Sequence, residues 1–334
     1  MVGFRGDRVD GGGVIAKAIR AGRVGGVILF DKHLATKSSE NNIIDPEQTR
    51  QLVADLKDLA QEDLLVAVDQ EGGAVSRFKA ERGFPVTDRA SLLASCADAD
   101  VTRAAARQTA QMLSDLGINF NLAPVVDLNT NPENPIIGRH GRSFGDEPQT
   151  VVRHAAAWIE EHRRRGVACC LKHFPGHGSS REDSHSNFTD ISETWHKKEL
   201  MPFQMLINVG LADAVMAGHL FHRRLDPEFP ATLSPAIIGL LRRELAFDGV
   251  VVSDDMQMAA LTSRFGFAET VWRALAAGID IVLIGNNLVE SFDAPGRFER
   301  AIDRALRCND LDEDSIEKAR RRVRLLKQSI KKRA

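Results

Sequence analysis

An alternation of short apolar runs with amphipathic stretches constrains the fold of this chain more than any other feature of its sequence. Eight runs are apolar almost throughout, as strands buried on both faces should be. They are Met1–Phe4, Val24–Phe30, Leu64–Asp69, Phe120–Asp127, Val167–His173, Ala214–His219, Val250–Asp254 and Ile279–Ile284. Seven amphipathic stretches of helical length accompany them: Pro46–Ala60, Ala99–Leu116, Thr150–Arg165, Lys197–Val209, Pro235–Glu244, Phe267–Ala277 and Arg297–Cys308. Strands that alternate with helices in this way form parallel sheets.

The residues at the strand ends distinguish a closed barrel from an open doubly wound sheet. Polar side chains capable of chemistry close several different strands: Asp69, Asp127, Lys172 with His173, His219 and Asp254. A barrel collects such residues at one mouth, whereas an open sheet confines them to one switch point. We therefore predict a TIM-like (β/α)8 barrel that forms a single α/β domain over residues 1–334, with a first strand clipped at the N-terminus.

Composition and charge exclude several classes of partner. Hydrophobic residues make up 43% and charged residues 27% of the 334 residues, which is typical of a globular chain. The formal charge of −2 gives no basic excess for nucleic acid or an anionic membrane. No run of ~20 apolar residues predicts a membrane span, and the N-terminus lacks the apolar core of a signal peptide. Four scattered cysteines predict no disulfide framework, which favours the cytoplasm.

The C-terminal stretch Lys318–Arg333 is strongly basic. Its apolar residues Val323, Leu325, Leu326 and Ile330 predict a helix that is docked by one face and keeps its charges in water. Oligomeric state is not predicted by any feature of the sequence.

The densest group of reactive side chains is KHFPGHGSSREDSH, from Lys172 to His185. It follows a predicted buried strand and contains three histidines, which core packing does not explain, although His177 alone also suits a structural role. Asp183 and His185 are two residues apart, so in an extended segment they share a face. A carboxylate beside an imidazole raises its pKa towards neutrality, as a general acid/base requires.

Two further segments contribute charged side chains at strand ends. Asp254 and Asp255 close the run GVVVSDD, where Asp255 is a candidate N-cap for a helix from Met256 and Asp254 is expected to project into the mouth. In AVDQEGGAVSRF, Asp69 can accept hydrogen bonds from two vicinal hydroxyls of a ligand, form an ion pair with Arg77, or do both. Arg142, in GRSFG, adds a cation near a strand end. Dinucleotide, Walker and CxxC motifs are absent, so neither a cofactor nor a metal is predicted.

These segments resemble glycoside hydrolase family 3, and within it the bacterial β-N-acetylhexosaminidases. The matching motifs run in order through VGGVILF, AVDQEGG, FNLAPVVDLN, GRSFG, LKHFPGHG, EDSH and VVSDDMQM. Two motifs depart from the family pattern. Ser179 and Ser180 replace the Asp-Thr of GHGDT, and Ala74 stands where an arginine is common after EGG.

The resemblance implies a retaining, exo-acting enzyme that cleaves terminal β-linked N-acetylglucosamine, with a role in muropeptide recycling. It implies that Asp254 is the nucleophile, that His185 is the acid/base and that Asp183 is the partner of His185. By the same resemblance, five residues hold the N-acetylglucosamine unit: Asp69, Arg77, Arg142, Lys172 and His173. The expected partner is thus a carbohydrate substrate.

Four alternatives stay open at this level. In the first, phosphate replaces water and the enzyme is a glycoside phosphorylase. In the second, the enzyme is a β-glucosidase of the same family. A metal-dependent amidohydrolase could use His173, His177, His185 and Asp254 as ligands, although the HxH pair with which such sites begin is missing. A carbohydrate-binding protein with a dead site would have no need for the Asp183–His185 pair.

Overall fold

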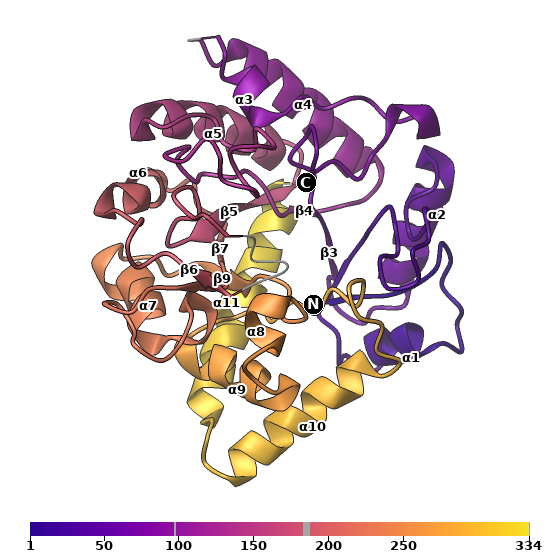
Figure 1. Ribbon diagram of the computed structural model, residues 1–334. Coiled ribbons are helices and arrows are strands. Elements are labelled where there is room, and N and C mark those ends of the chain that lie inside the picture. The colour runs from indigo at the N-terminus through magenta and orange to yellow at the C-terminus, as the bar shows by residue number, and fades with distance from the viewer. Residues whose placement is uncertain (97, 183–187, 334) are drawn as a thin grey trace.

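A parallel sheet of seven strands organises the molecule. The computed structural model describes residues 1–96, 98–182 and 188–333 (Figure 1). The strands lie in the order β1 (Val2–Gly3), β2 (Gly26–Ile28), β3 (Leu65–Val68), β4 (Phe120–Asn121), β5 (Ala168–Phe174), β7 (Ala214–Ala217) and β9 (Val250–Ser253). Every neighbouring pair is parallel. A separate parallel pair joins β6 (Thr189–Asp190) to β8 (Leu220–Phe221). Seven of the eight predicted strands are therefore confirmed, most of them shorter than expected.

Helices surround the strands in chain order, as Figure 1 shows. They are α1 (Val14–Arg20), α2 (Pro46–Asp58), α3 (Ala90–Leu93), α4 (Asp100–Asp115), α5 (Pro148–Arg163), α6 (Met201–Asn208), α7 (Pro235–Gly239), α8 (Ala259–Thr262), α9 (Phe267–Ala277), α10 (Ala294–Arg307) and α11 (Glu313–Arg333). The seven predicted helices are confirmed with small shifts at their ends. Two of them are composite: the 3₁₀ turn η2 (Lys197–Leu200) precedes α6, and the π-helical η4 (Leu240–Glu244) follows α7. The sequence pattern does not predict the seven-residue α1.

Local chemistry explains where α2 begins. Pro46 occupies the first helical position of α2, where its missing N–H costs nothing. The Asp45 side chain accepts a hydrogen bond of 2.9 Å from the backbone amide of Gln48, which satisfies one of the free donors of the first turn.

Two apolar cores lie on opposite faces of the sheet, because side chains alternate along each strand. In β3, Val66 and Val68 belong to the larger core, which includes the apolar faces of the helices, whereas Leu65 and Ala67 belong to a second core. The same alternation occurs in β7 and β9. Both faces of the strands are therefore buried, as the apolar runs predicted.

The segment Ile279–Ile284 lies between the two edges of the sheet, although it is not a regular strand. Ile281 forms a parallel bridge to Val252 of β9, and Ile284 forms one to Val2 of β1. The backbone amides of Ser253 and Gly3 donate to the carbonyls of Ile281 and Ile284, both at 2.9 Å. Since the last and the first strand contact the same six-residue segment, the parallel sheet is curled.

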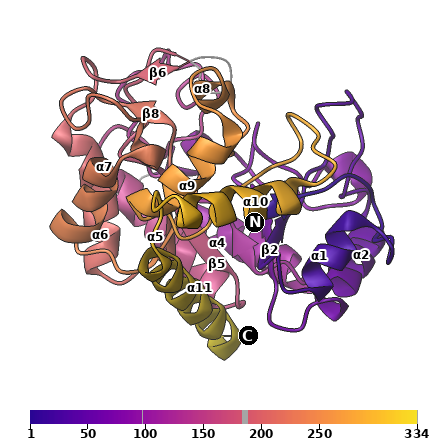
Figure 2. The same cartoon turned by 90° about the horizontal axis from the view of Figure 1, so that it is seen from below.

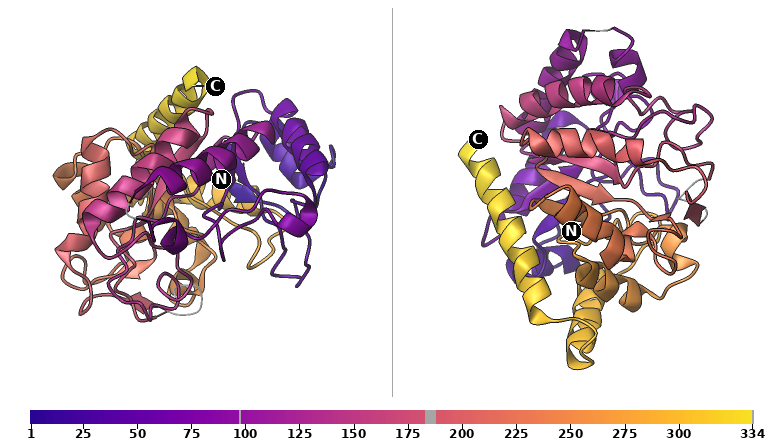
Figure 3. Two further views of the ribbon diagram at one scale, coloured as in Figure 1. Left: turned by 90° about the horizontal axis from the view of Figure 1, so that it is seen from above. Right: turned by 90° about the vertical axis from the view of Figure 1, so that its left-hand side faces the viewer.

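The C-terminal helix α11 covers the amino-terminal ends of the strands (Figures 2 and 3). Leu326 and Ile330 belong to the second core, so they seal it at this end. Burial of each such side chain stabilises the fold by about 1.5–3 kcal/mol. The prediction of a helix docked by one face is confirmed, but Leu325 is 52% exposed and does not belong to that face.

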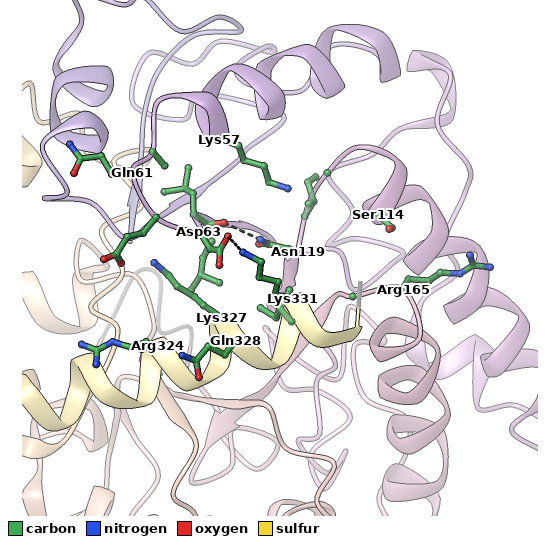
Figure 4. A pocket seen from close by; sticks show the side chains of 18 residues that line it. Lys57, Gln61, Asp63, Ser114, Asn119, Arg165, Arg324, Lys327, Gln328 and Lys331 are labelled. Carbon is green, nitrogen blue, oxygen red and sulfur yellow. Dashed lines mark hydrogen bonds and ion pairs between the residues drawn. The ribbon is translucent and has the colours of Figure 1, made fainter.

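A cavity of about 710 Å³ also lies at the amino-terminal ends of the strands, between α2, α11 and the loops before β3, β4 and β5 (Figure 4). Lysines and arginines outnumber acidic side chains in its lining, and Lys331 lies 3.6 Å from Asp63. The residues that close the strands lie at the opposite edge of the sheet, so they do not line this cavity. No helix in the described ranges is long and apolar enough to cross a membrane.

Candidate active site

The carboxyl ends of neighbouring strands bring the predicted site residues to one edge of the sheet. Asp69 follows β3, Lys172 and His173 lie in β5, and Asp254 follows β9. All three strands run parallel within one sheet, so their ends meet on the same side. The edge opposite to α11 is therefore the candidate active site.

Five charged side chains at this edge form a connected group, which we name the ionic cluster: Asp69, Glu71, Arg77, Arg142 and Lys172. The Lys172 ammonium lies 2.8 Å from Asp69 Oδ1 and 2.7 Å from Glu71 Oε1. Arg142 donates two hydrogen bonds to Glu71, from Nε to Oε2 at 2.7 Å and from Nη2 to Oε1 at 2.8 Å. Arg77 Nη2 lies 3.4 Å from Asp69 Oδ2. Four of the five predicted sugar-binding residues are thus connected, either by direct contact with one another or through Glu71.

Solvent exposure divides the ionic cluster into buried members and partly exposed members. The side chains of Lys172 and Glu71 are 2% and 5% exposed, whereas those of Asp69 and Arg77 are 17% and 26% exposed. The Arg77 guanidinium also lies over the Phe30 ring, 5.5 Å from its centroid. A ligand that enters this edge would therefore meet Asp69 and Arg77, while the pairs beneath hold them in place.

The ionic cluster keeps its members charged in spite of their burial. Burial opposes ionisation of Asp69, but the positive charges of Lys172 and Arg77 hold the pKa of this carboxyl below its usual range. Arg142 and Lys172 likewise outweigh burial and hold the pKa of Glu71 well below its usual range. Burial lowers and the two carboxylates raise the pKa of Lys172, with a net rise. The site therefore presents ionised groups to its ligand.

A buried His–Asp pair lies beside the ionic cluster. His173 Nδ1 and Asp127 Oδ2 are 2.7 Å apart, and Asp127 also accepts the backbone amide of His173 at 3.0 Å and that of His177 at 2.8 Å. Hydrogen bonding at Nδ1 fixes the ring of His173, whose Nε2 lies 3.4 Å from Arg142 Nη2. His173, predicted to bind sugar, is thus joined to the ionic cluster through Arg142.

Two further histidines in the described part of this edge have structural contacts. His177 Nδ1 lies 2.7 Å from Ser180 Oγ, and burial lowers the pKa of His177 to about 4. His219 bridges Thr232 Oγ1 at 2.8 Å and the backbone carbonyl of Asp255 at 2.9 Å. These contacts favour a structural role for both rings.

The two aspartates after β9 differ in what they contact. The Asp254 amide donates to the Ala217 carbonyl at 3.0 Å, and Asp254 Oδ1 accepts from the Asp255 amide at 2.8 Å. The predicted cap is wrong, because α8 begins at Ala259 with Met258 as its N-cap. Asp255 instead accepts hydrogen bonds from the amides of Gln257 and Gly285, at 3.1 and 2.9 Å. It thereby ties the turn after β9 to the end of the segment Ile279–Ile284.

Asp183 and His185, the predicted acid/base pair, lie outside the described residues. The structure therefore leaves their assignment as a prediction from the sequence.

Glu71 is a charged side chain of this edge that the sequence analysis did not name, and Asp127 was placed at a strand end without a role. Glu71 stands in the EGG of AVDQEGG, yet only the approach of Arg142, 71 positions along the chain, reveals its role. Asp127 closes a predicted strand, but the sequence alone gives it no partner. Its position at the end of the predicted strand that comes just before the strand Val167–His173 was the available signal.

Comparisons with known proteins agree with this arrangement. Residues 10–326 match the family model described as the Glycosyl hydrolase family 3 N terminal domain. Beta-hexosaminidase LpqI of Mycobacterium tuberculosis is 37% identical over 272 residues, which cover 79% of this chain and 68% of the relative. Beta-hexosaminidase A of Pseudoalteromonas piscicida is 31% identical over 328 residues, covering 92% of this chain and 54% of the relative.

Solved structures give the same picture. A family 3 β-N-acetylglucosaminidase from Paenibacillus sp. str. FPU-7 superposes with a TM-score of 0.89 at 34% identity, covering 100% of this chain and 61% of the other. A β-N-acetylhexosaminidase from Beutenbergia cavernae superposes with a TM-score of 0.86 at 30% identity, covering 98% and 96%. The chain therefore spans a little over half of the Pseudoalteromonas relative and three fifths of the Paenibacillus structure.

Proposed function

This chain belongs to glycosyl hydrolase family 3, and on that premise we propose that it is a retaining, exo-acting β-N-acetylhexosaminidase that cleaves terminal β-linked N-acetylglucosamine. The observation that carries the proposal is the ionic cluster. It joins Asp69, Arg77, Arg142 and Lys172 at the sheet edge where Asp254 follows β9.

The cluster suits a polyhydroxylated, uncharged ligand. The partly exposed Asp69 can accept hydrogen bonds from vicinal sugar hydroxyls, and Arg77 can donate to them. Beneath them Lys172, Arg142 and the Asp127-bound His173 restrict the movement of the binding groups. Side chains locked in this way lose little entropy on binding, so more of the binding energy is available to distort the sugar ring.

Hydrolysis would proceed in two steps at the anomeric carbon. Asp254 attacks this carbon and forms a covalent glycosyl ester, while protonated His185 gives its proton to the departing glycosidic oxygen and Asp183 stabilises the imidazolium. Neutral His185 then removes a proton from water, whose oxygen replaces Asp254 at the anomeric carbon. Two displacements restore the original configuration and free the carboxylate.

We also propose that the fold is a complete barrel within one catalytic domain, residues 1–334. Ile281 and Leu283 belong to the second core, whereas Val282 and Ile284 belong to the larger one. This is the alternation of a strand, and the bridges to β9 and β1 suit an eighth strand that closes the ring.

Charge pairing favours water over phosphate as the acceptor. Each of the three cations of the ionic cluster lies within 4 Å of a carboxylate, so the cluster has little spare positive charge with which to bind an anion. Free N-acetylglucosamine released in phosphate buffer would support the hydrolase, whereas sugar-1-phosphate would identify a phosphorylase.

The proposed setting is the recycling of cell-wall muropeptides in the cytoplasm. Cys169 and Cys170 are buried free thiols, which agrees with a reducing compartment.

The decisive comparison of substrates is turnover on p-nitrophenyl N-acetyl-β-glucosaminide and p-nitrophenyl β-glucoside side by side. Faster turnover of the glucoside would contradict the proposed specificity.

The nucleophile has its own test. Asp254→Ala should lose nearly all turnover, because the glycosyl ester cannot form, and its unfolding midpoint should stay near that of the parent. Glu133→Gln, a change in an ion pair whose Glu133 side chain is 80% exposed, is the control. A rate for Asp254→Ala within a few-fold of the parent would remove Asp254 from this role.

A further inference from the structure

The turn that leaves β5 is held from two sides by carboxyl groups. We call Gly176–Ser180 the β5 turn. On one side, Asp127 accepts the His177 amide at 2.8 Å. On the other, Glu199 of η2 packs directly against Gly176, where an added Cβ would lie 2.6 Å from the Cβ of Glu199. Only glycine allows this approach, and the positive φ of 128° at Gly176 adds to that requirement.

The Glu199 carboxyl is buried and poorly satisfied. The residue is 1% exposed, and its Oε1 accepts a long hydrogen bond of 3.4 Å from the His196 amide. Oε2 of Glu199 and Oγ of Ser179 are both buried, and neither has a hydrogen bond of good geometry in the described part of the chain. An ionised carboxylate in such a place is costly, whereas a neutral acid is tolerated.

The charged and titratable groups around Glu199 also favour its neutral form. Burial and, to a smaller extent, the negative charge of Asp127 outweigh the hydrogen bonds from Ser179 and the His196 amide and raise the pKa of Glu199 to about 7. Across the β5 turn, burial opposes but His173 and His177 favour ionisation of Asp127, whose pKa is held below its usual range. His177 itself is neutral near pH 7, so it does not balance a second negative charge.

We propose that Glu199 is a positioning residue of the active site: as the neutral acid it holds the β5 turn against Asp127, and its ionisation loosens the turn and lowers turnover. Two carboxylates would then face each other across five buried residues, and repulsion between them would be relieved by movement of the turn. The same Asp127 orients His173, so the disturbance reaches the sugar-binding edge. The effect on turnover rests on the function proposed above.

The test is the pH profile of Glu199→Gln, a neutral side chain of the same shape. We would measure kcat/KM of the parent and the variant on p-nitrophenyl N-acetyl-β-glucosaminide from pH 5 to 9. Dividing the two profiles cancels the ionisations they share. The ratio of variant to parent should be constant below pH 6 and should rise roughly tenfold per pH unit well above pH 7, because only the parent acquires the charge. Glu193→Gln, an exposed acid just before η2, should give a flat ratio.

A second measurement does not depend on catalysis. Hydrogen exchange of a peptide covering residues 174–180 should accelerate above pH 7 in the parent beyond the ordinary effect of base, and Glu199→Gln should lack that extra acceleration. A flat kcat/KM ratio in a folded variant would overturn the proposal, and so would unchanged exchange in the parent. If the parent hydrolyses neither glycoside, the proposed function fails, and the exchange measurement alone decides the role of Glu199.

Discussion

Glu71 offers the sharpest test of the ionic cluster, because it is the only carboxylate that contacts both Arg142 and Lys172 in the described residues. Glu71→Gln keeps the volume of the side chain and removes its charge. The Arg142 and Lys172 side chains, 8% and 2% exposed, would then lose a buried counter-charge. Breaking a buried pair from one side costs about 3–5 kcal/mol, since the remaining charge stays out of water.

This loss translates into a measurable change in thermal stability. For 334 residues the unfolding entropy of about 2 cal/mol/K per residue converts 3–5 kcal/mol into a drop in Tm of roughly 4–7 °C. Urea unfolding followed by tryptophan fluorescence gives the free energy directly, with Trp158 buried in the larger core as a reporter. Glu133→Gln, which alters an exposed ion pair, should cost less than about 1 kcal/mol.

The difference in the free energy of unfolding between the parent and Glu71→Gln should change with pH in a definite direction. The pKa of folded Glu71 lies well below its usual value of 4.5, so its stabilisation is present above the unfolded pKa and is lost as the pH falls towards the folded one. The gap between the parent and Glu71→Gln should therefore be largest near pH 7 and shrink below about pH 4.5. A loss under about 1 kcal/mol at pH 7, equal to that of the exposed pair, would refute the idea that the cluster depends on Glu71.

Three further outcomes are expected. Arg77→Met should reduce kcat/KM by roughly 10- to 150-fold, because a charge-assisted hydrogen bond to the sugar is worth about 1.5–3 kcal/mol; a change under threefold in steady-state kinetics would contradict its contact with substrate. Treatment with EDTA should leave turnover unchanged, whereas loss of activity that Zn²⁺ restores would favour the metal-dependent alternative. Because the fold raises the pKa of Glu199, the contribution of this side chain to the free energy of unfolding is complete below the unfolded pKa near 4.5. That contribution is lost as the pH rises through about 7. Relative to the parent, Glu199→Gln should therefore gain up to about 3 kcal/mol of stability between pH 4 and pH 8 in urea unfolding, and no relative gain would contradict the buried neutral acid.

The sequence by itself determined the order of the elements and the edge on which the site lies. Helices such as α2 follow from contacts within a few residues, the Asp45 cap and the proline after it, so their beginnings can be predicted locally. Parallel strands place all their carboxyl ends on one side, which is why the positions of Asp69, Lys172 and Asp254 along the chain suffice to assign them to one edge.

Only the tertiary structure decided how these groups are paired and charged. Glu71 contacts Arg142 and Lys172 because curled strands bring together residues that are far apart along the chain. The raised pKa of Glu199 depends on its burial against Gly176 and on the negative charge of Asp127, and no local pattern of residues predicts either. Asp255 stabilises a turn and the segment after it instead of a helix, because Gly285 approaches it from another part of the fold. Desolvation and through-space charge set these properties, and both are defined only when the chain is packed.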